Sequence, residues 1–240
     1  MKTVLIFMIL LFVSCSRNEP GTNTRSTTDS SKSKSEIRKF DLSDGQKKVL
    51  DGAKKCLETK FNYDITMGYY ILTYKNGVNT GNKVFPGGDM DPMLGVCTEV
   101  TIRALRWGGV CDLQKEIYND IKSNRADYPM GRWGAKKPDP NIDQRRVPNQ
   151  MVWFSKHWET ITNGLYEPGD IIAWDMDNDS WGDHIGIVSD KFVDPSPTLP
   201  GEERFTAGRP LLIHNFPSPG YVAEEEVLNR WKIIGHYRVK

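Results

Sequence analysis

The stretch GVCTEVTIRALR, residues 95–106, is the segment on which the fold prediction depends. Its apolar positions suit a mostly buried helix, and they are Val96, Val100, Ile102, Ala104 and Leu105. Two glycines, Gly108 and Gly109, follow Trp107 and break the pattern, so the helix is predicted to end there. Cys97 therefore lies in the first turn of the predicted helix.

A cysteine at the start of a helix is a candidate nucleophile. The exposed N–H groups and the positive end of the helix dipole stabilise a thiolate, which is the reactive form of the side chain. The same N–H groups point to where a tetrahedral intermediate would develop negative charge. Such chemistry also needs a base within hydrogen-bond reach, here a histidine. The alternative is that this cysteine is only a small packing residue.

Two of the four histidines lie at the ends of predicted strands. His184 begins the strand 184–188, and His214 ends the strand 210–214. Neighbouring strands would bring the two rings together. His184 is then the candidate base, and His214, or Asn215 in its place, would accept the other ring N–H of His184 and fix its tautomer. The alternative is that both histidines only pack in the core.

The order of elements predicts the fold class. Ser43 caps a helix whose apolar stripe reaches Phe61, Asp112 caps a second helix, and a third short helix is predicted at residues 152–158. Four β-rich runs follow the helices, at residues 170–174, 184–188, 210–214 and 231–237. Helices first and strands afterwards predict an α+β domain with an antiparallel sheet.

The sequence of 240 residues has a distinct beginning. Residues 1–15 have a charged start, an apolar run and Ser14 before Cys15, which resembles a bacterial lipoprotein signal with Cys15 as the lipidated residue. A soluble secreted protein or an uncleaved anchor are the alternatives. Residues 16–40 are polar and predict a flexible linker, and residues 41–240 form the predicted folded domain. We expect an exported protein that a lipid anchors to a membrane of the bacterial cell envelope.

Charge and cysteine content narrow the function classes. Lys+Arg 32 against Asp+Glu 31 gives a formal net charge of +1 without a basic stripe, which argues against a nucleic-acid partner. The domain holds an odd number of cysteines, so at least one thiol is expected to be free unless it pairs with another chain. Cys56 lies on an apolar helix stripe and is expected to pack, with a Cys56–Cys111 disulfide as the alternative.

Several blocks of sequence resemble the bacterial NlpC-type cell-wall peptidases. Residues 95–106 resemble their nucleophile helix, EPGDII at 167–172 resembles the strand before their histidine, and DHIGIV at 183–188 resembles their histidine strand. Within that clan the chain is most similar to an uncharacterised branch, the domain of unknown function 1287 family. The blocks of that branch are PGGD at 86–89, DLQ at 112–114, NIDQRRVPN at 141–149, IHN at 213–215 and GHYR at 235–238.

The resemblance covers about residues 44–240 and implies a papain-like fold of the NlpC type. In that fold N-terminal helices, the nucleophile helix among them, pack on an antiparallel β-sheet. The resemblance implies Cys97 as nucleophile, His184 as base and His214 as the third member of a triad that acts on peptidoglycan peptides. No cofactor and no metal are expected. Glu99 stands where the branch usually has an aspartate.

Five more residues are candidates for the oxyanion site or for substrate binding. Tyr70 and Tyr74 match a tyrosine-bearing segment of related enzymes and could donate to the oxyanion, or they could simply pack. Arg145 and Arg146 could hold a substrate carboxylate bidentately, although a structural role in their loop is slightly favoured. Asp89 could position the nucleophile loop or cap its helix, and a structural role is again favoured.

Two other patterns carry less weight. DMDNDS at 175–180 imitates the start of a calcium-binding loop, but Ser180 replaces the needed glycine and Gly186 falls where a bidentate glutamate belongs. A solvated hairpin loop is therefore predicted there. His157 and His236 have no partner in a recognisable pattern and are assigned to packing or to the surface.

These residues support three functional hypotheses. The first is a cysteine hydrolase that cleaves an amide bond of peptidoglycan peptides through a covalent acyl-enzyme. The second is a module of the same fold that binds muropeptides or a protein without cleaving them. The third places zinc on Cys97, His184 and His214, and it is least favoured because a papain-like layout already uses all three residues.

Overall fold

The structure, a computed structural model, describes residues 40–64, 66, 68–193 and 208–240. The described residues belong to one compact unit, Ile37–Lys240. The predicted signal peptide, Cys15 and all but the last residue of the predicted linker lie outside the described residues. None of the described helices is both long and apolar enough to cross a membrane.

The helices of the described residues precede most of the strands. The α-helices are α1 (Asp44–Thr59), α2 (Cys97–Trp107), α3 (Leu113–Ser123) and α4 (Val147–His157), with 3-10 turns at Arg125–Asp127, Met130–Trp133 and Asp143–Arg145. Both predicted caps are confirmed, because Ser43 forms a capping box with Gln46 and the side chain of Asp112 accepts a hydrogen bond in the first turn of α3. α4 begins earlier than predicted, at Val147, where Pro148 suits the first helical turn.

A six-stranded antiparallel sheet has the strand order β5-β10-β6-β7-β8-β9. Its strands are β5 (Glu159–Thr160), β6 (Ile171–Asp175), β7 (His184–Val193), β8 (Arg209–Asn215), β9 (Val222–Glu225) and β10 (Lys232–Arg238). Two small sheets pair β1 (Asn62–Tyr63) with β4 (Leu94–Gly95), and β2 (Tyr74–Lys75) with β3 (Val78–Asn79). The four predicted strands are thus β6, β7, β8 and β10, whereas the sequence pattern did not predict β9 or the two-residue strands.

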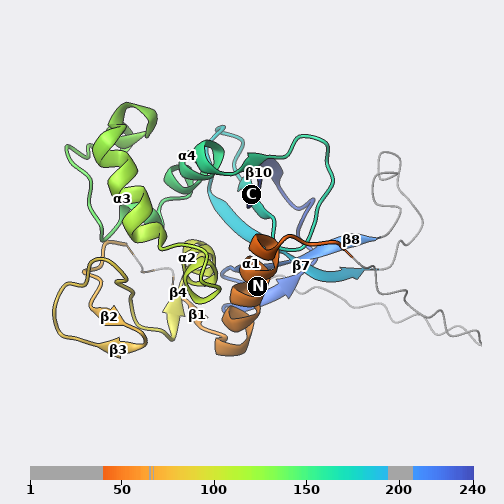
Figure 1. The fold of residues 1–240 in the computed structure, drawn as a ribbon, viewed down its shortest axis with the longest axis horizontal. Coiled ribbons are helices and arrows are strands. Elements are labelled where there is room, and N and C mark those ends of the chain that lie inside the picture. The colour runs from red at the N-terminus through yellow and green to blue at the C-terminus, as the bar shows by residue number, and fades with distance from the viewer. Residues whose placement is uncertain (1–39, 65, 67, 194–207) are drawn as a thin grey trace, which may run out of the picture. The chain divides into compact units, whose positions relative to one another are not determined.

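α1 and α2 pack on one face of the sheet, against β7 and β8 (Figure 1). The two helices approach each other closely because Gly52 has no side chain, and a Cβ there would lie 1.9 Å from the carbonyl oxygen of Ala104. The main core lies between these helices and the sheet, and Val100 and Ile185 are fully buried in it. The predicted α+β fold is therefore confirmed, with the helix that begins at Cys97 packed on an antiparallel sheet.

A second, smaller core covers the opposite face of the sheet. Its buried members are Ile172, Trp174, Val188, Leu212, Val227 and Leu228. Successive side chains of a strand alternate between the two faces. His184 and His214 therefore share the face of Trp174, whereas Ile185 and Ile213 point toward the helices.

All three cysteines of the described residues are free thiols, so the alternative of a Cys56–Cys111 disulfide is wrong. Cys56 is fully buried on α1, as the apolar stripe predicted. Its Sγ lies 3.7 Å from the carbonyl oxygen of Val100. Burial raises the pKa of this thiol, so Cys56 is an inert packing residue.

Candidate active site

Cys97 is the first residue of α2 and is 8% exposed. Its Sγ lies 4.0 Å from the carbonyl oxygen of Asp183, and the backbone N–H of Ile185 favours its thiolate form. Because Asp183 and Ile185 flank His184 in the chain, the sulfur lies against the backbone of β7 on both sides of His184. Among the described residues, no hydrogen bond joins Sγ to the His184 ring.

The thiol of Cys97 is neutral in the free protein. Burial raises its pKa from the ordinary 9.0 to about 12, and the nearby charge of Glu99 adds to the rise. The backbone N–H groups of Ile185, Thr98 and Cys97 oppose this shift without cancelling it. The prediction that the helix start makes the thiol acidic is therefore wrong for the free protein, because desolvation outweighs the helix terminus. Attack by this sulfur requires a base that removes its proton.

The rings of His184 and His214 share a hydrogen bond, with His184 Nε2 2.9 Å from His214 Nδ1. The neighbouring antiparallel strands β7 and β8 bring them together, and both residues are buried. Asn215, the alternative partner for His184, is used elsewhere: its Nδ2 donates to the carbonyl oxygen of Gly95 at 3.2 Å. Asn215 thereby ties the end of β8 to β4, which ends two residues before Cys97.

Aromatic rings enclose His184 with centroid distances of 5.4, 5.0 and 5.3 Å, and they belong to Trp174, Phe216 and Trp231. Burial, together with His214 and the charge of Arg230, holds the pKa of His184 well below 6.5. The ring is therefore neutral at pH 7, with a lone pair that can accept a proton. Its second nitrogen, Nδ1, has no hydrogen-bond partner among the described residues.

Glu225 on β9 lies behind His214. Its Oε2 is 3.3 Å from His214 Nε2, but the two atoms are not in hydrogen-bond geometry, and each is buried without another partner. An N–H on His214 Nε2 that faces this carboxylate leaves Nδ1 as an acceptor, so His184 donates from Nε2 and keeps its lone pair on Nδ1. Burial and the charge of Arg230 lower the pKa of His214 to about 4, so this ring is also neutral at pH 7.

Tyr63 lies beside the nucleophile, because the pairing of β1 with β4 sets it opposite Gly95. Burial and the neighbouring Cys97 sulfur raise the pKa of its hydroxyl, which stays a protonated donor. Sequence reasoning missed Tyr63, since a two-residue strand gives no periodic pattern. It offered Tyr74 and Tyr70 as candidates, with packing as the alternative. The Tyr74 hydroxyl bonds the carboxylate of Asp91 at 3.4 Å, and Tyr70 is 38% exposed. Within the described residues neither forms a hydrogen bond with the Cys97 turn.

The two candidate substrate arginines are held by protein carboxylates. Arg145 Nε lies 2.7 Å from Glu99 Oε1 in a pair that is almost fully buried, and Arg146 Nη1 lies 2.8 Å from Asp143 Oδ1. Glu99 also accepts a hydrogen bond from the backbone N–H of Val96 at 2.8 Å. The Arg146–Asp143 pair has the structural role that the sequence slightly favoured, a loop held by Asp143. The Arg145–Glu99 pair has a different one, since it fixes the turn before the nucleophile.

Asp89 holds the nucleophile helix from the side. Its carboxylate accepts from Nε and Nη2 of Arg103 at 3.1 and 2.9 Å, and Arg106 Nη1 lies 3.5 Å away. Arg103 is in the middle of α2 and is fully buried. Asp89 therefore does not cap this helix, as one alternative held, but neutralises a buried guanidinium and ties the PGGD loop to the helix.

His236 is buried and its ring stacks on that of Tyr166, as the assignment to packing expected, but it also has a polar partner. Its Nε2 lies 2.7 Å from Asp170 Oδ2, and Arg238 binds both carboxylate oxygens of Asp170 at 2.7 Å. Asp170 is fully buried just before β6, so these bonds join β6 to β10. The sequence blocks around residues 168–170 and 235–238 thus meet in one structural cluster. His157 lies half exposed on α4 against a tryptophan ring, as expected.

Within the described residues, one group of acidic side chains could hold a metal ion, and it consists of Asp175, Asp177, Asp179 and Asp183. Asp175 accepts from the N–H of Ser180 at 3.0 Å, and Asp183 accepts from the N–H of Met176 at 2.9 Å. These bonds order the loop from within, in line with the predicted hairpin loop. Cys97, His184 and His214 do not form such a group, so the geometry does not support the zinc hypothesis.

Comparison with known families and curated proteins gives matches over most of the chain. The family described as Domain of unknown function (DUF1287) matches residues 52–239. The uncharacterized protein YijF of Escherichia coli (strain K12) is 40% identical over 194 residues, which make up 79% of this chain and 80% of YijF.

Solved structures give weaker similarities. NlpC2 from Trichomonas vaginalis has a TM-score of 0.37 and 13% identity, with 84% of this chain and 48% of that chain covered. The chain thus spans about half the length of NlpC2. An N-acetylmuramoyl-L-alanine amidase from Bacteroides uniformis ATCC 8492 has a TM-score of 0.43 and 17% identity, with 82% of this chain and 100% of that chain covered.

Proposed function

We propose that this chain, which belongs to the DUF1287 family of unknown function, is a cysteine hydrolase in which Cys97 attacks an amide bond and His184 is the base. The observation that carries the proposal is the position of the Cys97 sulfur on the backbone that flanks a buried, neutral His184. A neutral thiol beside a neutral imidazole supports general-base catalysis in place of a preformed ion pair.

In the proposed reaction, Nδ1 of His184 accepts the proton of Cys97 Sγ while the sulfur attacks the carbonyl carbon. The tetrahedral intermediate collapses when the imidazolium gives this proton to the leaving amine, and a thioester remains on Cys97. Water then attacks the thioester and gives a proton to the same nitrogen, after which the acid leaves and the thiol is restored. The sulfur and the ring are not hydrogen-bonded in the free protein, so they must meet when substrate binds.

Neighbouring groups have supporting roles in this proposal. The oxyanion of the intermediate would face the first N–H groups of α2 and the hydroxyl of Tyr63. His214 accepts the Nε2–H of His184, and the carboxylate of Glu225 favours the tautomer of His214 that can do so. Both are positioning residues, because they act on the reacting atoms only through His184.

We propose peptidoglycan peptides as the substrate and the bacterial cell envelope as the location. The support is the leader at residues 1–15, with Cys15 as the lipid attachment site, followed by the polar segment 16–40 that would act as a tether. The blocks of sequence that resemble cell-wall peptidases support the same substrate. The net charge of +1 argues against a nucleic-acid partner.

Digestion of purified peptidoglycan, followed by mass spectrometry of the released fragments, tests the proposal. The wild-type protein is expected to release peptides whose masses identify the cleaved bond, and Cys97→Ala is expected to melt at the same temperature but release none. Cys111→Ala is the matched control, since this thiol is also free but is only partly buried and lies after α2. An undiminished Cys97→Ala variant would refute the proposal.

A non-catalytic module that binds muropeptides or a protein is the second candidate. The observation in its favour is the pKa of about 12 at Cys97, because a neutral thiol is a poor nucleophile on its own. The same digestion separates the two candidates. A wild-type protein that binds peptidoglycan fragments but changes none of their masses is a binding module.

A further inference from the structure

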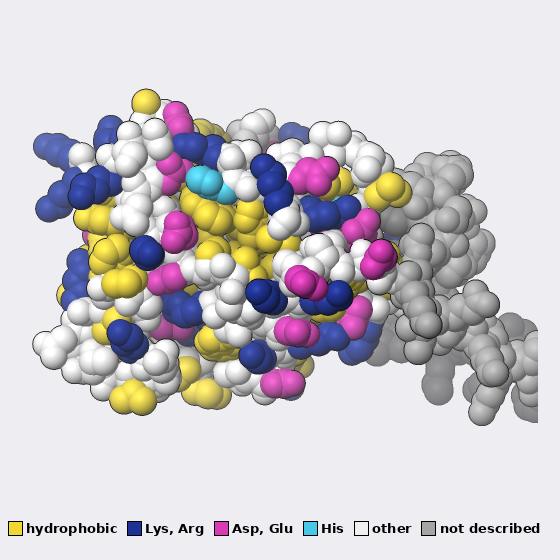
Figure 2. Space-filling view, in the orientation of Figure 1, with side chains coloured by type: hydrophobic (Ala, Val, Ile, Leu, Met, Phe, Trp, Pro, Cys, Tyr) yellow, Lys and Arg dark blue, Asp and Glu magenta, His cyan; other side chains and the backbone are white. Residues whose placement is uncertain are grey.

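Arg230 stands out among the described arginines, because its guanidinium has neither an ion pair nor a hydrogen bond there. The guanidinium groups of the other described arginines all bond protein oxygens, and these residues are Arg103, Arg106, Arg125, Arg132, Arg145, Arg146, Arg209 and Arg238. Basic and acidic side chains are interspersed over the face seen in Figure 2. Among the described arginines, a guanidinium that bonds no protein oxygen is therefore unusual.

Aromatic rings hold the side chain of Arg230 in place. Its guanidinium carbon lies 4.6 Å from the ring centroid of Trp231 and 5.5 Å from that of Phe216. Stacking of this kind covers the flat face of the guanidinium but leaves the N–H groups in its plane free to bind an anion. The positive charge is thus positioned before any ligand arrives.

The same two rings also contact the candidate base. The His184 ring centroid lies 5.3 Å from that of Trp231 and 5.0 Å from that of Phe216. The guanidinium and the imidazole are therefore separated by no more than about 10 Å, which is the length of about three extended residues. The charge of Arg230 lowers the pKa of both His184 and His214, as a separation this short leads one to expect.

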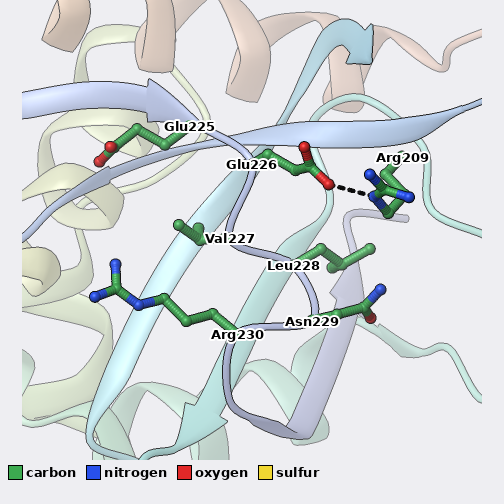
Figure 3. Close-up of a pocket in the computed structure, with 7 residues that line it drawn as sticks. All are labelled: Arg209, Glu225, Glu226, Val227, Leu228, Asn229 and Arg230. Atoms are coloured by element: carbon green, nitrogen blue, oxygen red, sulfur yellow. Dashed lines mark hydrogen bonds and ion pairs between the residues drawn. The ribbon is translucent and has the colours of Figure 1, made fainter. Parts of the chain in front are cut away.

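Arg230 also lines a pocket of about 370 Å³ that residues 225–230 and Arg209 form. Figure 3 shows the side chains of Arg230 and Glu225 extending to one side of this pocket, while Arg209 and Glu226 pair with each other on the other side. Glu226 is thereby neutralised, and Glu225 lies against His214. A pocket of this size can admit one small polar group of a ligand beside Arg230.

We propose that Arg230 binds a carboxylate of the substrate, within about three residues of the amide bond that is cleaved. A planar guanidinium can hold a carboxylate through two parallel N–H···O bonds. The two arginines that the sequence offered for this role, Arg145 and Arg146, are already bonded to protein carboxylates. The inference rests on the proposed function for the peptide nature of the ligand, but binding at Arg230 needs no turnover.

Calorimetric titration of the full chain carrying Cys97→Ala measures this binding without cleavage. The probes are a synthetic stem tetrapeptide of peptidoglycan with free carboxylates and the same peptide with every carboxylate converted to a carboxamide. The acid is expected to bind at least about tenfold more tightly than the amide, because hydrogen bonds between two charged groups are strong. Adding Arg230→Gln is expected to reduce this preference to about twofold or less.

Arg132→Gln, added to Cys97→Ala, is the matched control. Arg132 also stacks on a tryptophan, with its guanidinium carbon 4.3 Å from the Trp181 ring, but it bonds Asp179 at 3.2 Å. Its loss is expected to leave the preference for the acid unchanged. Arg230→Lys, which keeps the charge but not the planar fork, is expected to give an intermediate preference.

Two results would overturn the inference: a preference for the acid that survives Arg230→Gln, or no binding of either peptide to Cys97→Ala. The proposed function is tested separately by digestion. If the wild-type protein cleaves nothing while the preference still depends on Arg230, the hydrolase proposal fails and the anion site remains. If digestion proceeds normally while Arg230→Gln changes no preference, the anion site fails and the hydrolase proposal remains.

Discussion

His184 and His236 are both buried on strands of the same sheet, yet their neighbours differ. His236 lies 2.7 Å from the carboxylate of Asp170, which Arg238 also binds through two nitrogens. Among the described residues, His184 has only a neutral ring, that of His214, as its hydrogen-bond partner, and aromatic rings surround it. The cluster around Asp170 satisfies its charges and joins two strands, whereas the pair around His184 leaves one ring nitrogen without a partner.

The difference indicates which buried histidine can take part in chemistry. The ring of His236 is engaged with a carboxylate whose two oxygens also bind Arg238, so it takes part in a cluster that joins strands. A histidine among neutral and aromatic neighbours keeps a lone pair at pH 7 and can accept a proton from a substrate or a nucleophile. In the part of the chain that the structure describes, His214 Nε2 and Glu225 Oε2 on the His184 side are buried without a partner, and no such atom occurs in the Asp170 cluster.

Replacing each histidine by glutamine breaks the comparison most directly. His184→Gln removes the proposed base, so the rate of peptide release from peptidoglycan is expected to fall at least about 10³-fold. His236→Gln is the matched control, because a glutamine amide can still donate to Asp170. Its rate per folded molecule is expected to stay within about twofold of the wild type. Equal losses in both variants would show that the two clusters do not divide into a reactive and a structural one.

Asp170→Asn is expected to weaken the structural cluster. Removing the charge leaves the guanidinium of Arg238 without its buried partner, and the free energy of unfolding is expected to fall by about 3 kcal/mol. Urea denaturation followed by tryptophan fluorescence measures this change. Asp190→Asn is the control, because its ion pair with Lys54 lies on the surface and is expected to contribute less than about 1 kcal/mol. An equally small loss of stability in both variants would show that the cluster around Asp170 does not stabilise the fold.

The sequence predicted those parts of the molecule that local patterns determine. Apolar periodicity and two glycines predicted α2 with Cys97 in its first turn, and Ser43 predicted the start of α1. His184 and His214 could be paired in advance because each lies at the end of a strand with a clear β pattern. These features depend on neighbours within a few residues, which a single sequence contains.

The sequence could not predict contacts that only the tertiary fold creates. Tyr63 and Glu225 lie on short strands without a periodic pattern, so nothing placed them near the candidate site. The helix start argued for an acidic Cys97 thiol, but burial by the whole fold raises its pKa. A structural role was slightly favoured for Arg145, but its partner Glu99 lies 46 residues earlier in the chain and could not be named from the sequence.

Acid is expected to destabilise the protein through the His184–His214 pair. The pKa of His214 is about 4 in the folded protein and 6.5 ordinarily, so the unfolded chain binds this proton more readily. Its contribution to stability is therefore complete above pH 6.5 and is lost as the pH falls toward 4, and the lowered pKa of His184 acts in the same direction.

Urea denaturation at several pH values measures this effect. The titration of His214 alone is expected to lower the free energy of unfolding of the wild type by roughly 2 kcal/mol between about pH 7 and pH 5, and His184 adds to this fall. His214→Gln cannot titrate at this position and is expected to show a flatter dependence, although it is less stable at pH 7. A wild-type protein whose stability is constant over this range would contradict the assignment of neutral, buried rings.

Glu225→Gln tests whether Glu225 sets the tautomer of His214. The variant is expected to lose about tenfold in kcat with little change in KM. A carboxylate can only accept from His214 Nε2, whereas a glutamine amide can also donate to it and so permit the opposite tautomer. In that tautomer Nδ1 of His214 carries the proton and donates it to Nε2 of His184. His184 then carries its own proton on Nδ1 and has no lone pair there with which to act as a base.

Glu226→Gln is the control for this prediction, because the neighbouring carboxylate lines the same pocket but pairs with Arg209. Its kcat is expected to equal that of the wild type, and Glu225→Asp, which keeps an acceptor, is expected to recover part of the rate. A purely structural role for Glu225 would lower stability and leave kcat of the folded enzyme unchanged. In that case Glu225 does not determine the tautomer of His214, and the residues that prepare the base are His184 and His214 alone.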